Sequence, residues 1–586
     1  MATEWNDHGM ATECPRNARG TARGQRRLLT RLFFDRTLDN DLLSPRAGLE
    51  VGLAGVLAVV ALPGLALPTF ALLKYTYPFT SDVARDLASL GDKCLFVSLA
   101  MLALTGLASL TWDSLRPDER DYRILVPLPV GLTTLLEAKA RALGLVFLVF
   151  TAAVMSAAPV VFPMVMLVTS DASTLEIARW MLAHVVSVAA AAAFAFFGMV
   201  ALHGLLVGAL GPRLFRRVSP WIQSAAVFAT TVAFLLLPLI GSLTYPLKRA
   251  GGLALALAPQ MWFVGMYQTL GGRGDPDWRR LAGFGALAVV SSVLLAAVTM
   301  WAGYRRHVSL TLEAAGARRA DRPVARRVGA WLGHVAAGCD PGRHALLAFA
   351  LRTMTRSPRH RMILAAFLGM GCAVSAVGLI SVTWRRAGFV PPTPDAVMSV
   401  QNVLAFFVVA AAAAGASVPS DLAAGWVFRL LEGRDARAWL SGLRRAVVAG
   451  GIVPLLALLF PLHTALLGWP TALAHALVGL VMSIMLVELM LGGFRRAPFA
   501  CAGTPGAGGP RPRWVAYWFG FSLYAFTLAR VEAWAFDQPG GLMTLLGVGL
   551  AAVVALVVVR TVRPFEGTLA FDEPADWAMS RLDLTV

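Results

Sequence analysis

Long apolar runs constrain the fold of this chain more than any other feature of its sequence. Twelve of them are long enough to cross about 30 Å of hydrocarbon as an α-helix, and a segment alone in lipid satisfies its backbone hydrogen bonds only as a helix. They lie near residues 48–73, 93–111, 143–168, 180–210, 219–241, 281–304, 361–383, 396–416, 446–468, 471–494, 514–534 and 541–559. We therefore predict an all-α polytopic membrane protein with about twelve transmembrane helices.

The runs form two groups of six, which predict two six-helix bundles separated by an Arg-rich connector. By this division the chain has a cytoplasmic basic tail with an amphipathic elbow helix at 1–47, a first bundle at 48–304, a cytoplasmic basic linker with a second elbow at 305–360, a second bundle at 361–560 and a cytoplasmic tail at 561–586. Each bundle carries a charged loop after its second span, which indicates a duplicated six-span unit.

The two predicted elbows interleave Leu and Phe with Arg. They read RRLLTRLFFDRTL at 26–38 and HALLAFALRTMTR at 344–356. Such a segment lies along the membrane interface, with its apolar side chains among the acyl chains and its guanidinium groups at the headgroups. In the first elbow we expect the acyl-facing side chains to be Leu28, Leu29, Leu32 and Phe33 and the headgroup-facing ones to be Arg27, Arg31 and Arg36.

The formal net charge of +18 is interpreted as an orientation signal. With the amino terminus inside, most of the 52 Lys and Arg residues fall in segments on the cytoplasmic side, as the positive-inside rule requires. We therefore predict that both termini are cytoplasmic and that the chain binds no nucleic acid. Residues 1–27 are polar and lack the apolar core of a signal peptide, so the first span would act as the insertion signal.

One apolar segment, 252–270, is predicted not to cross the membrane. Pro259 and Gln260 interrupt it near its middle, and Trp262 and Tyr267 are residue types typical of the membrane–water interface. Counting the segment as a span would also place the Arg-rich linker outside the cell. We therefore expect a re-entrant or interfacial helical hairpin on the outer face between spans five and six.

A compact cluster of acidic and basic side chains lies between the second and third runs, in WDSLRPDERDYRILVPLPVGLTTLLEAKAR at 112–141. Its basic residues place it on the cytoplasmic side, and a loop at 419–445 takes the equivalent place in the second half. We interpret both as docking surfaces for a soluble partner; the alternative is a solvated loop that only sets topology. The candidate partner-coupling residues are Asp113, Arg116, Asp118, Glu119, Arg120, Asp121 and Arg123 in the first loop and Asp421, Arg429, Glu432, Arg434 and Asp435 in the second.

Few ionisable side chains lie within the apolar runs. Glu488, in the tenth run, is the candidate for a functional group at membrane depth. A charge is costly there, so an ionisable residue in a span is interpreted first as functional. Arg530 and Glu532 lie near the outer end of the eleventh run, where snorkelling and a local ion pair between them would explain both.

The sequence contains no motif for a nucleotide, a metal or a cofactor. A P-loop needs Gly-Lys followed by Ser or Thr, and none of the four lysines has that context. The five cysteines are scattered without a CxxC pair, and no Ser/His/Asp grouping is convincing. We therefore predict no cofactor and no enzymatic activity. Because none has HExxH spacing, we expect interhelical hydrogen bonding from the membrane histidines His184, His203, His463 and His475.

The run WDSLRPDERDYRILVPLPV, followed by LLEAKARAL and a span, resembles bacterial ABC transporter permeases of the type-2 exporter class. Three further features are similar to that group: PSDLAAGWVFRLLEG at 419–433, APFACAGTPG at 497–506 and the aromatic hairpin around Trp262 and Phe263. The likeness extends over most of the chain, from about residue 26 to the tail at 563–586.

This resemblance implies an elbow helix at 26–38, a coupling region at 113–123 that rests on an ATPase, and outer helices at 252–270. The chain departs from the usual pattern by having twelve predicted spans where a half-transporter has six, and by carrying no ATPase domain. A fused pair of halves would explain the first departure, and a separate ATPase subunit the second.

The expected function is that of a membrane-spanning permease subunit of an ABC-type export system in the bacterial cytoplasmic membrane. Its partners would be the lipid bilayer and a P-loop ATPase subunit, which binds ATP and docks on the loops at 112–141 and 419–445. One alternative is a secondary transporter of the major facilitator kind, although its usual G-x-x-x-D-R-x-G-R-R loop is not matched by WDSLRPDERDYR. Another is a membrane scaffold without transport activity. Nothing in the sequence identifies a substrate.

Overall fold

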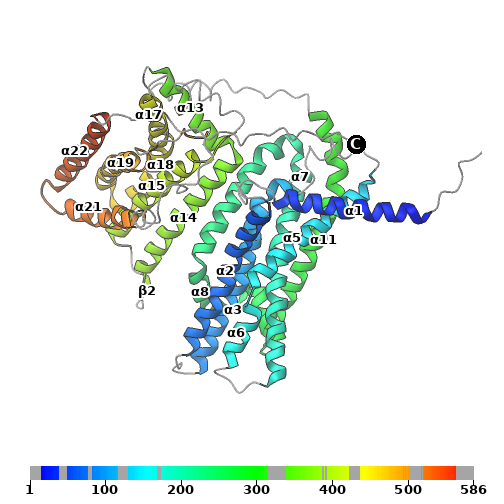
Figure 1. Cartoon of the computed structure of the whole chain (residues 1–586). Helices are drawn as coiled ribbons and strands as arrows, with labels where there is room; N and C mark the ends of the chain where they lie inside the picture. The colour runs from blue at the N-terminus through cyan, green and yellow to red at the C-terminus, as the bar shows by residue number, and fades with distance from the viewer. Residues whose placement is uncertain are drawn as a thin grey trace, which may run out of the picture. The chain divides into compact units, whose positions relative to one another are not determined.

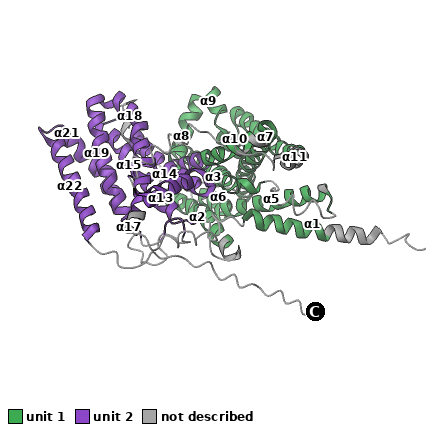
Figure 2. Ribbon diagram, turned by 90° about the horizontal axis from the view of Figure 1, so that it is seen from above, with its two compact units in different colours: residues 1–226, 237–317 green, residues 227–236, 318–586 purple. Residues whose placement is uncertain are grey.

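The chain folds into helices that form two compact units (Figure 2). Unit 1 comprises residues 1–226 and 237–317, and unit 2 comprises residues 227–236 and 318–586. The computed structural model describes residues 15–38, 49–76, 82–115, 130–167, 173–314, 338, 340–385, 388–389, 392–420, 436–492, 494, 497–500, 517 and 519–562. These residues are almost all α-helical, which confirms the predicted all-α polytopic membrane fold.

Unit 1 contains ten α-helices and one 3-10 turn among its described residues, and the last part of α7 belongs to unit 2. In chain order they are α1 (Pro15–Leu38), α2 (Leu49–Thr76), α3 (Asp82–Leu110), the 3-10 turn η1 (Trp112–Ser114), α5 (Leu132–Met155), α6 (Ala158–Leu167), α7 (Thr174–Leu235), α8 (Leu237–Ala250), α9 (Gly252–Ala256), α10 (Pro259–Leu270) and α11 (Pro276–Ala314).

Unit 2 adds a second set of helices, with two short π-helical stretches and one two-residue β-ladder among its described residues. Its elements are α13 (Pro341–Arg356), α14 (Pro358–Thr383), β1 (Trp384–Arg385), β2 (Gly388–Phe389), α15 (Pro394–Ala416), α17 (Ala436–Val447), the π-helix η2 (Val448–Ile452), α18 (Val453–Leu467), α19 (Trp469–Leu491), the π-helix η3 (Leu523–Thr527), α21 (Leu528–Phe536) and α22 (Gly541–Val562).

Within the described residues, eleven helical segments are long and apolar enough to span a membrane. They correspond to eleven of the twelve predicted runs; α5 and α6 together form one of them, and α7 contains two. The run at 514–534 is not among the eleven. Part of it lies outside the described residues, and the described part forms η3 and the start of α21.

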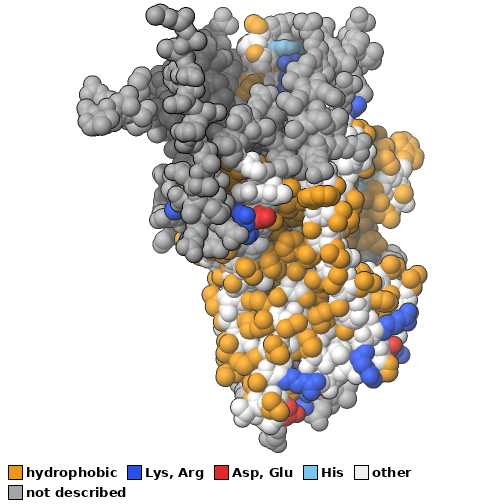
Figure 3. Space-filling model, turned by 90° about the vertical axis from the view of Figure 1, so that its right-hand side faces the viewer, with side chains coloured by type: hydrophobic (Ala, Val, Ile, Leu, Met, Phe, Trp, Pro, Cys, Tyr) orange, Lys and Arg blue, Asp and Glu red, His pale blue; other side chains and the backbone are white. Residues whose placement is uncertain are grey.

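The surface of the molecule has the character expected of a lipid-facing protein. Large hydrophobic side chains are exposed along the spans, including Leu62 at 63% and Phe70 at 66%. In Figure 3 hydrophobic side chains cover much of the face shown, and Lys, Arg, Asp and Glu lie below this apolar area and above it, beside the grey atoms. A soluble protein rarely exposes so large an apolar area. The chain is therefore a multi-pass membrane protein.

The first predicted elbow is the carboxyl-terminal half of α1, which runs across the end of the neighbouring helices of unit 1 (Figure 1). The prediction that four apolar side chains of this elbow face the acyl chains is only partly correct. Leu29 and Phe33 are buried at 7% and 1% exposure against α5, whereas Leu28 and Leu32 remain exposed. Residues four apart share one face of a helix, and α5 takes up the face that carries Leu29 and Phe33.

The predicted outer hairpin at 252–270 forms two short helices. The chain breaks at Leu257 and Ala258, and Pro259 begins α10, where its missing N–H costs nothing. The segment is not among the spans, as predicted. Its second helix does not lie free at an interface, however, because α10 packs on α11 and α3 and buries Phe263 and Val264 completely.

The predicted linker at 305–360 is described at both of its ends. α11 continues past the end of its membrane span to Ala314, so residues 305–314 belong to the same helix as the sixth span. The described part of the linker resumes before α13, which contains the second predicted elbow at 344–356. Asp340 caps this helix by accepting hydrogen bonds from the Gly342 and Arg343 N–H groups.

Candidate functional site

The predicted coupling loops are described only at their edges. η1 begins the first loop, and the Asp113 side chain is exposed there. The remaining candidates lie outside the described residues: Arg116, Asp118, Glu119, Arg120, Asp121 and Arg123 in the first loop and Asp421, Arg429, Glu432, Arg434 and Asp435 in the second.

The start of the first loop is anchored in the protein by Trp112. Its indole is completely buried, and its N–H donates a hydrogen bond to Ser219 Oγ over 2.8 Å. The ring also meets the His203 imidazole edge-on, with 4.8 Å between centroids. About one turn before Trp112, the Ser109 carbonyl accepts a hydrogen bond from the Gln223 side chain over 3.0 Å. The end of α3 is thus bonded to the part of α7 that follows its break at Gly211.

The far side of the loop leads into α5, which is bonded to α1. The buried Lys139 ammonium donates to Thr37 Oγ1 over 3.3 Å and lies 5.2 Å from the centre of the Phe33 ring. Arg26 pairs with Glu137 over 3.0 Å at the half-exposed edge of the same contact. Burial of a lysine is costly, so this contact holds α1 on α5 through specific polar partners as well as through apolar packing.

Glu488 lies in α19 between two arginines of unit 2. Its Oε1 is 3.5 Å from Arg444 Nε on α17, and its Oε2 accepts a hydrogen bond from Arg560 on α22. The side chains of Glu488 and Arg444 are only 13% and 8% exposed. This three-charge cluster, Arg444–Glu488–Arg560, supplies the charge compensation that a carboxylate at membrane depth needs. Glu488 therefore joins three helices, a contact that its own sequence neighbours did not indicate.

The expected ion pair between Arg530 and Glu532 does not form. Glu532 is buried at 1% exposure and contacts His475 of α19, with Oε1 2.8 Å from Nδ1. Arg530 is 82% exposed and pairs instead with Asp395 of α15 over 3.3 Å. The reason is helical geometry, because residues two apart on α21 point in different directions. The interhelical hydrogen bonding predicted for the histidines is confirmed at His475.

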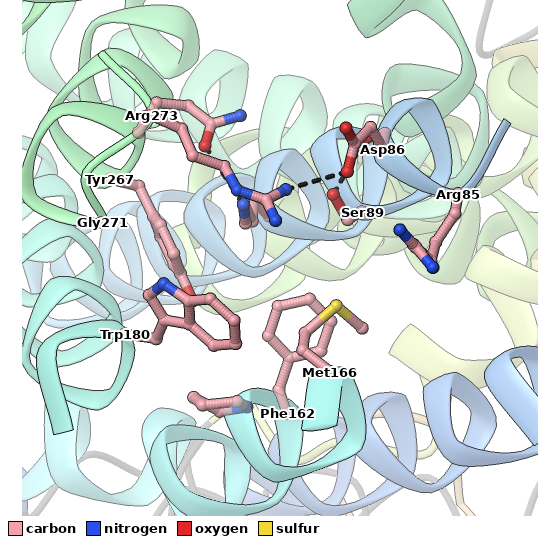
Figure 4. A pocket seen from close by; sticks show the side chains of 12 residues that line it. Arg85, Asp86, Ser89, Phe162, Met166, Trp180, Tyr267, Gly271 and Arg273 are labelled. Carbon is pink, nitrogen blue, oxygen red and sulfur yellow. Dashed lines mark hydrogen bonds and ion pairs between the residues drawn. The ribbon is translucent and has the colours of Figure 1, made fainter. Parts of the chain in front are cut away.

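A pocket in unit 1 brings together charged and aromatic side chains that the sequence did not indicate as a site (Figure 4). Asp86 and Arg273 form an ion pair of 2.8 Å at its rim, and the Arg273 guanidinium lies over the Trp180 ring at 5.9 Å. Phe162 and Met166 of α6 line the opposite wall. The full lining is Arg85, Asp86, Ser89, Lys93, Phe162, Pro163, Met166, Trp180, Tyr267, Gln268, Gly271 and Arg273.

Lys93 is the buried cation of this pocket, at 9% exposure. Its ammonium donates to Gln268 Oε1 over 3.1 Å and lies 5.1 Å from the centre of the Tyr267 ring. Burial raises the pKa of the Tyr267 phenol, so its hydroxyl stays protonated beside His184 Nδ1, 3.2 Å away. The sequence contained one signal of this site: Asp86, Asp92 and Lys93 are charges placed where the second run begins.

No protein-family model, curated protein or solved structure matches this chain.

Proposed function

We propose that this chain is the membrane-spanning permease subunit of an ABC-type export system in the bacterial cytoplasmic membrane. Both termini and the loops at 112–141 and 419–445 would face the cytoplasm. A separate P-loop ATPase subunit would dock on these loops and bind and hydrolyse the ATP, so the permease itself would need no catalytic site for ATP. Movement of the ATPase would then reach the spans through the loops.

The attachment of both ends of the first loop is the observation that carries this proposal. The Trp112–Ser219 bond ties its start to α7, and α5, which follows its end, is held to α1 through Lys139 and Glu137. A loop held in this way passes a displacement on to the spans α3, α5 and α7. A loop that only set topology would not need a fully buried tryptophan as its first residue.

Two further features of unit 1 support the same proposal. The amphipathic α1 crosses the end of the bundle in front of the first span, where the resemblance implies an elbow helix. The helices α9 and α10 lie between the fifth and sixth spans without crossing the membrane, where the resemblance implies outer helices. Both arrangements are ones that the resemblance to type-2 export permeases implies.

The test is co-purification of an ATPase with the full chain, gently solubilised from its native host. We expect a P-loop ATPase with the wild type and its loss in the double variant Arg120→Glu/Arg123→Glu, because charge reversal turns complementary contacts into repulsive ones. Arg279→Glu is the matched control, since it also reverses a charge but lies on α11 at the opposite end of the spans. Amounts of each variant in the membrane should be equal.

The alternatives make different predictions in the same experiment. Wild-type protein that carries no ATPase, yet transports a solute with an ion gradient, would replace the proposal with a secondary transporter. Retention of the ATPase in the double variant would show that the ATPase docks on a surface other than 112–141. A protein that neither binds an ATPase nor changes transport on deletion would be a scaffold.

A further inference from the structure

The pocket of Figure 4 is continuous with a second, wider cavity in unit 1. Asp86, Ser89, Gln268 and Arg273 line both of them. The aromatic part holds about 40 Å³ of free space, enough for a few water molecules. The wider part holds about 410 Å³, enough for a polar group of several atoms, and adds the side chains of Leu87, Leu90, Tyr245, Lys248, Arg249, Asp275 and Trp278.

Cations outnumber carboxylates in this joined cavity, which we call the basic cavity. Among the described residues that line it, five side chains are cationic and two are carboxylates: the cations are Arg85, Lys93, Lys248, Arg249 and Arg273, and the carboxylates are Asp86 and Asp275. Low-dielectric walls strengthen the field of such a set of charges and raise the local concentration of anions. The basic cavity is thus suited to an anion.

Lys93 stands out among these cations because its side chain is buried. Among the described residues no carboxylate lies within ion-pair distance of its ammonium, and Gln268 supplies a neutral acceptor. The three acidic side chains nearby are each paired with another cation, as Asp92–Lys74, Asp86–Arg273 and Asp275–Lys248. An ammonium has three donors, of which Gln268 takes one, and Asp86 and Asp92 act on Lys93 only from beyond ion-pair distance. A bound anion would therefore add a direct charged partner.

The position of the basic cavity in the membrane indicates which kind of anion could bind there. α3, α7 and α11 all begin their membrane spans beside it, at Ala84, Thr174 and Pro276. It therefore lies at one surface of the membrane, at the depth of lipid headgroups. Several cations around a wide cavity suit a phosphate group, whose oxygens accept hydrogen bonds from more than one cation. Trp180 beside Arg273 has the amphipathic character typical of the same interface.

We infer that the basic cavity binds the phosphate group of an anionic ligand through Lys93 and Arg273. This site is separate from the charged loops, and its existence does not depend on an ATPase partner. The phosphate could belong to an anionic lipid that enters from the bilayer or to a soluble compound that enters from the aqueous side. The cavity would recognise the same phosphate group in both cases. A site for a soluble compound should bind free phosphate in the absence of anionic lipid, whereas a lipid site should bind the anionic lipid.

The experiment uses the full chain in nanodiscs made either of phosphatidylcholine or of phosphatidylcholine with phosphatidylglycerol. One arm measures binding of radiolabelled inorganic phosphate by equilibrium dialysis in the zwitterionic nanodiscs. The other measures enrichment of phosphatidylglycerol over phosphatidylcholine on the protein by native mass spectrometry. We expect binding in at least one arm. Phosphate binding alone indicates a soluble ligand, and phosphatidylglycerol enrichment alone indicates a lipid.

Three variants decide whether the binding is at this site. Lys93→Met and Arg273→Gln should each weaken it by about tenfold or more, the effect of losing one charge-assisted contact. Arg279→Gln, an exposed cation outside the cavity lining, should bind like the wild type. If Lys93→Met does not fold, Arg273→Gln alone decides, because its side chain is 48% exposed. No binding by the wild type, or equal binding by all variants, overturns the inference.

Discussion

The indole N–H of Trp112 donates a hydrogen bond over 2.8 Å to the hydroxyl of Ser219, 107 positions further along the chain. Trp112 is completely buried, and Ser219 is 5% exposed. The bond connects the residue that begins the charged loop with a span that does not flank that loop. A displacement of the loop therefore acts on α7 as well as on α3.

Removing this bond should separate docking from coupling. In Trp112→Phe the aromatic packing against His203 remains, but the donor to Ser219 is lost, at a cost of about 1 kcal/mol. On the proposed function, we expect an ATPase to co-purify as with the wild type, while stimulation of its activity by this chain falls several-fold. Ser219→Ala removes the acceptor and should act in the same direction. Normal stimulation in both variants would contradict a coupling role for the bond.

The arginine partners of Glu488 determine the effect that its replacement should have on stability. Glu488→Leu leaves Arg444 at 8% exposure without its anion, and breaking a buried ion pair from one side costs about 3–5 kcal/mol. We expect a clear fall in the thermal unfolding midpoint of the detergent-solubilised protein. The double variant Arg444→Met/Glu488→Leu should recover much of this loss. Equal stability of Glu488→Leu and the wild type would show that the cluster is not structural.

Glu532 and Arg530 should differ sharply in their effect on stability. Glu532→Leu leaves His475 Nδ1 without its buried partner, which should cost about 1–3 kcal/mol. Glu532→Gln keeps an acceptor and should cost less. Arg530→Gln breaks a pair whose cation is 82% exposed, and such surface pairs contribute about 0–1 kcal/mol. Thermal unfolding of the three variants checks this order, and a larger effect at Arg530 would reverse it.

Close packing of α10 on α11 should make Gly265 intolerant of a side chain. A Cβ at this position would lie 2.7 Å from Leu281 Cβ and 2.9 Å from the Trp278 carbonyl oxygen, so the helices would have to separate. We expect Gly265→Ala to destabilise unit 1 by about 1–3 kcal/mol. Gly283→Ala is the matched control on α11, because nothing lies within 4 Å of its Cβ. Equal stability of the two variants, measured by proteolysis or thermal unfolding, would contradict this packing.

Orientation in the membrane is checked by labelling single cysteines in sealed cells. With the five native cysteines replaced, a membrane-impermeant maleimide should label a cysteine at Asp277, in the exposed first turn of α11. It should spare a cysteine at Ala320, in the Arg-rich linker. Labelling of Ala320→Cys with protection of Asp277→Cys would invert the predicted orientation.

The sequence by itself determined the fold class, because the bilayer makes strong demands on local composition. A run of about 20 apolar residues is read directly as a helix in lipid, so eleven of the twelve predicted spans have counterparts among the described residues. The break in the 252–270 segment was equally local, since Pro259 marks it in the chain. Patterns within one segment were sufficient for these predictions.

The partners of buried polar groups were decided only by the tertiary structure. Glu532 is two residues from Arg530, yet it contacts His475, and Glu488 contacts arginines on two other helices. The basic cavity likewise combines α3, α6, α7, α8, α10 and α11 with the residues between α10 and α11, and no single segment carries its pattern. Hydropathy specifies that a helix enters the bilayer, but its rotation and neighbours follow from packing and hydrogen bonding between helices, which depend on residues far apart in the chain.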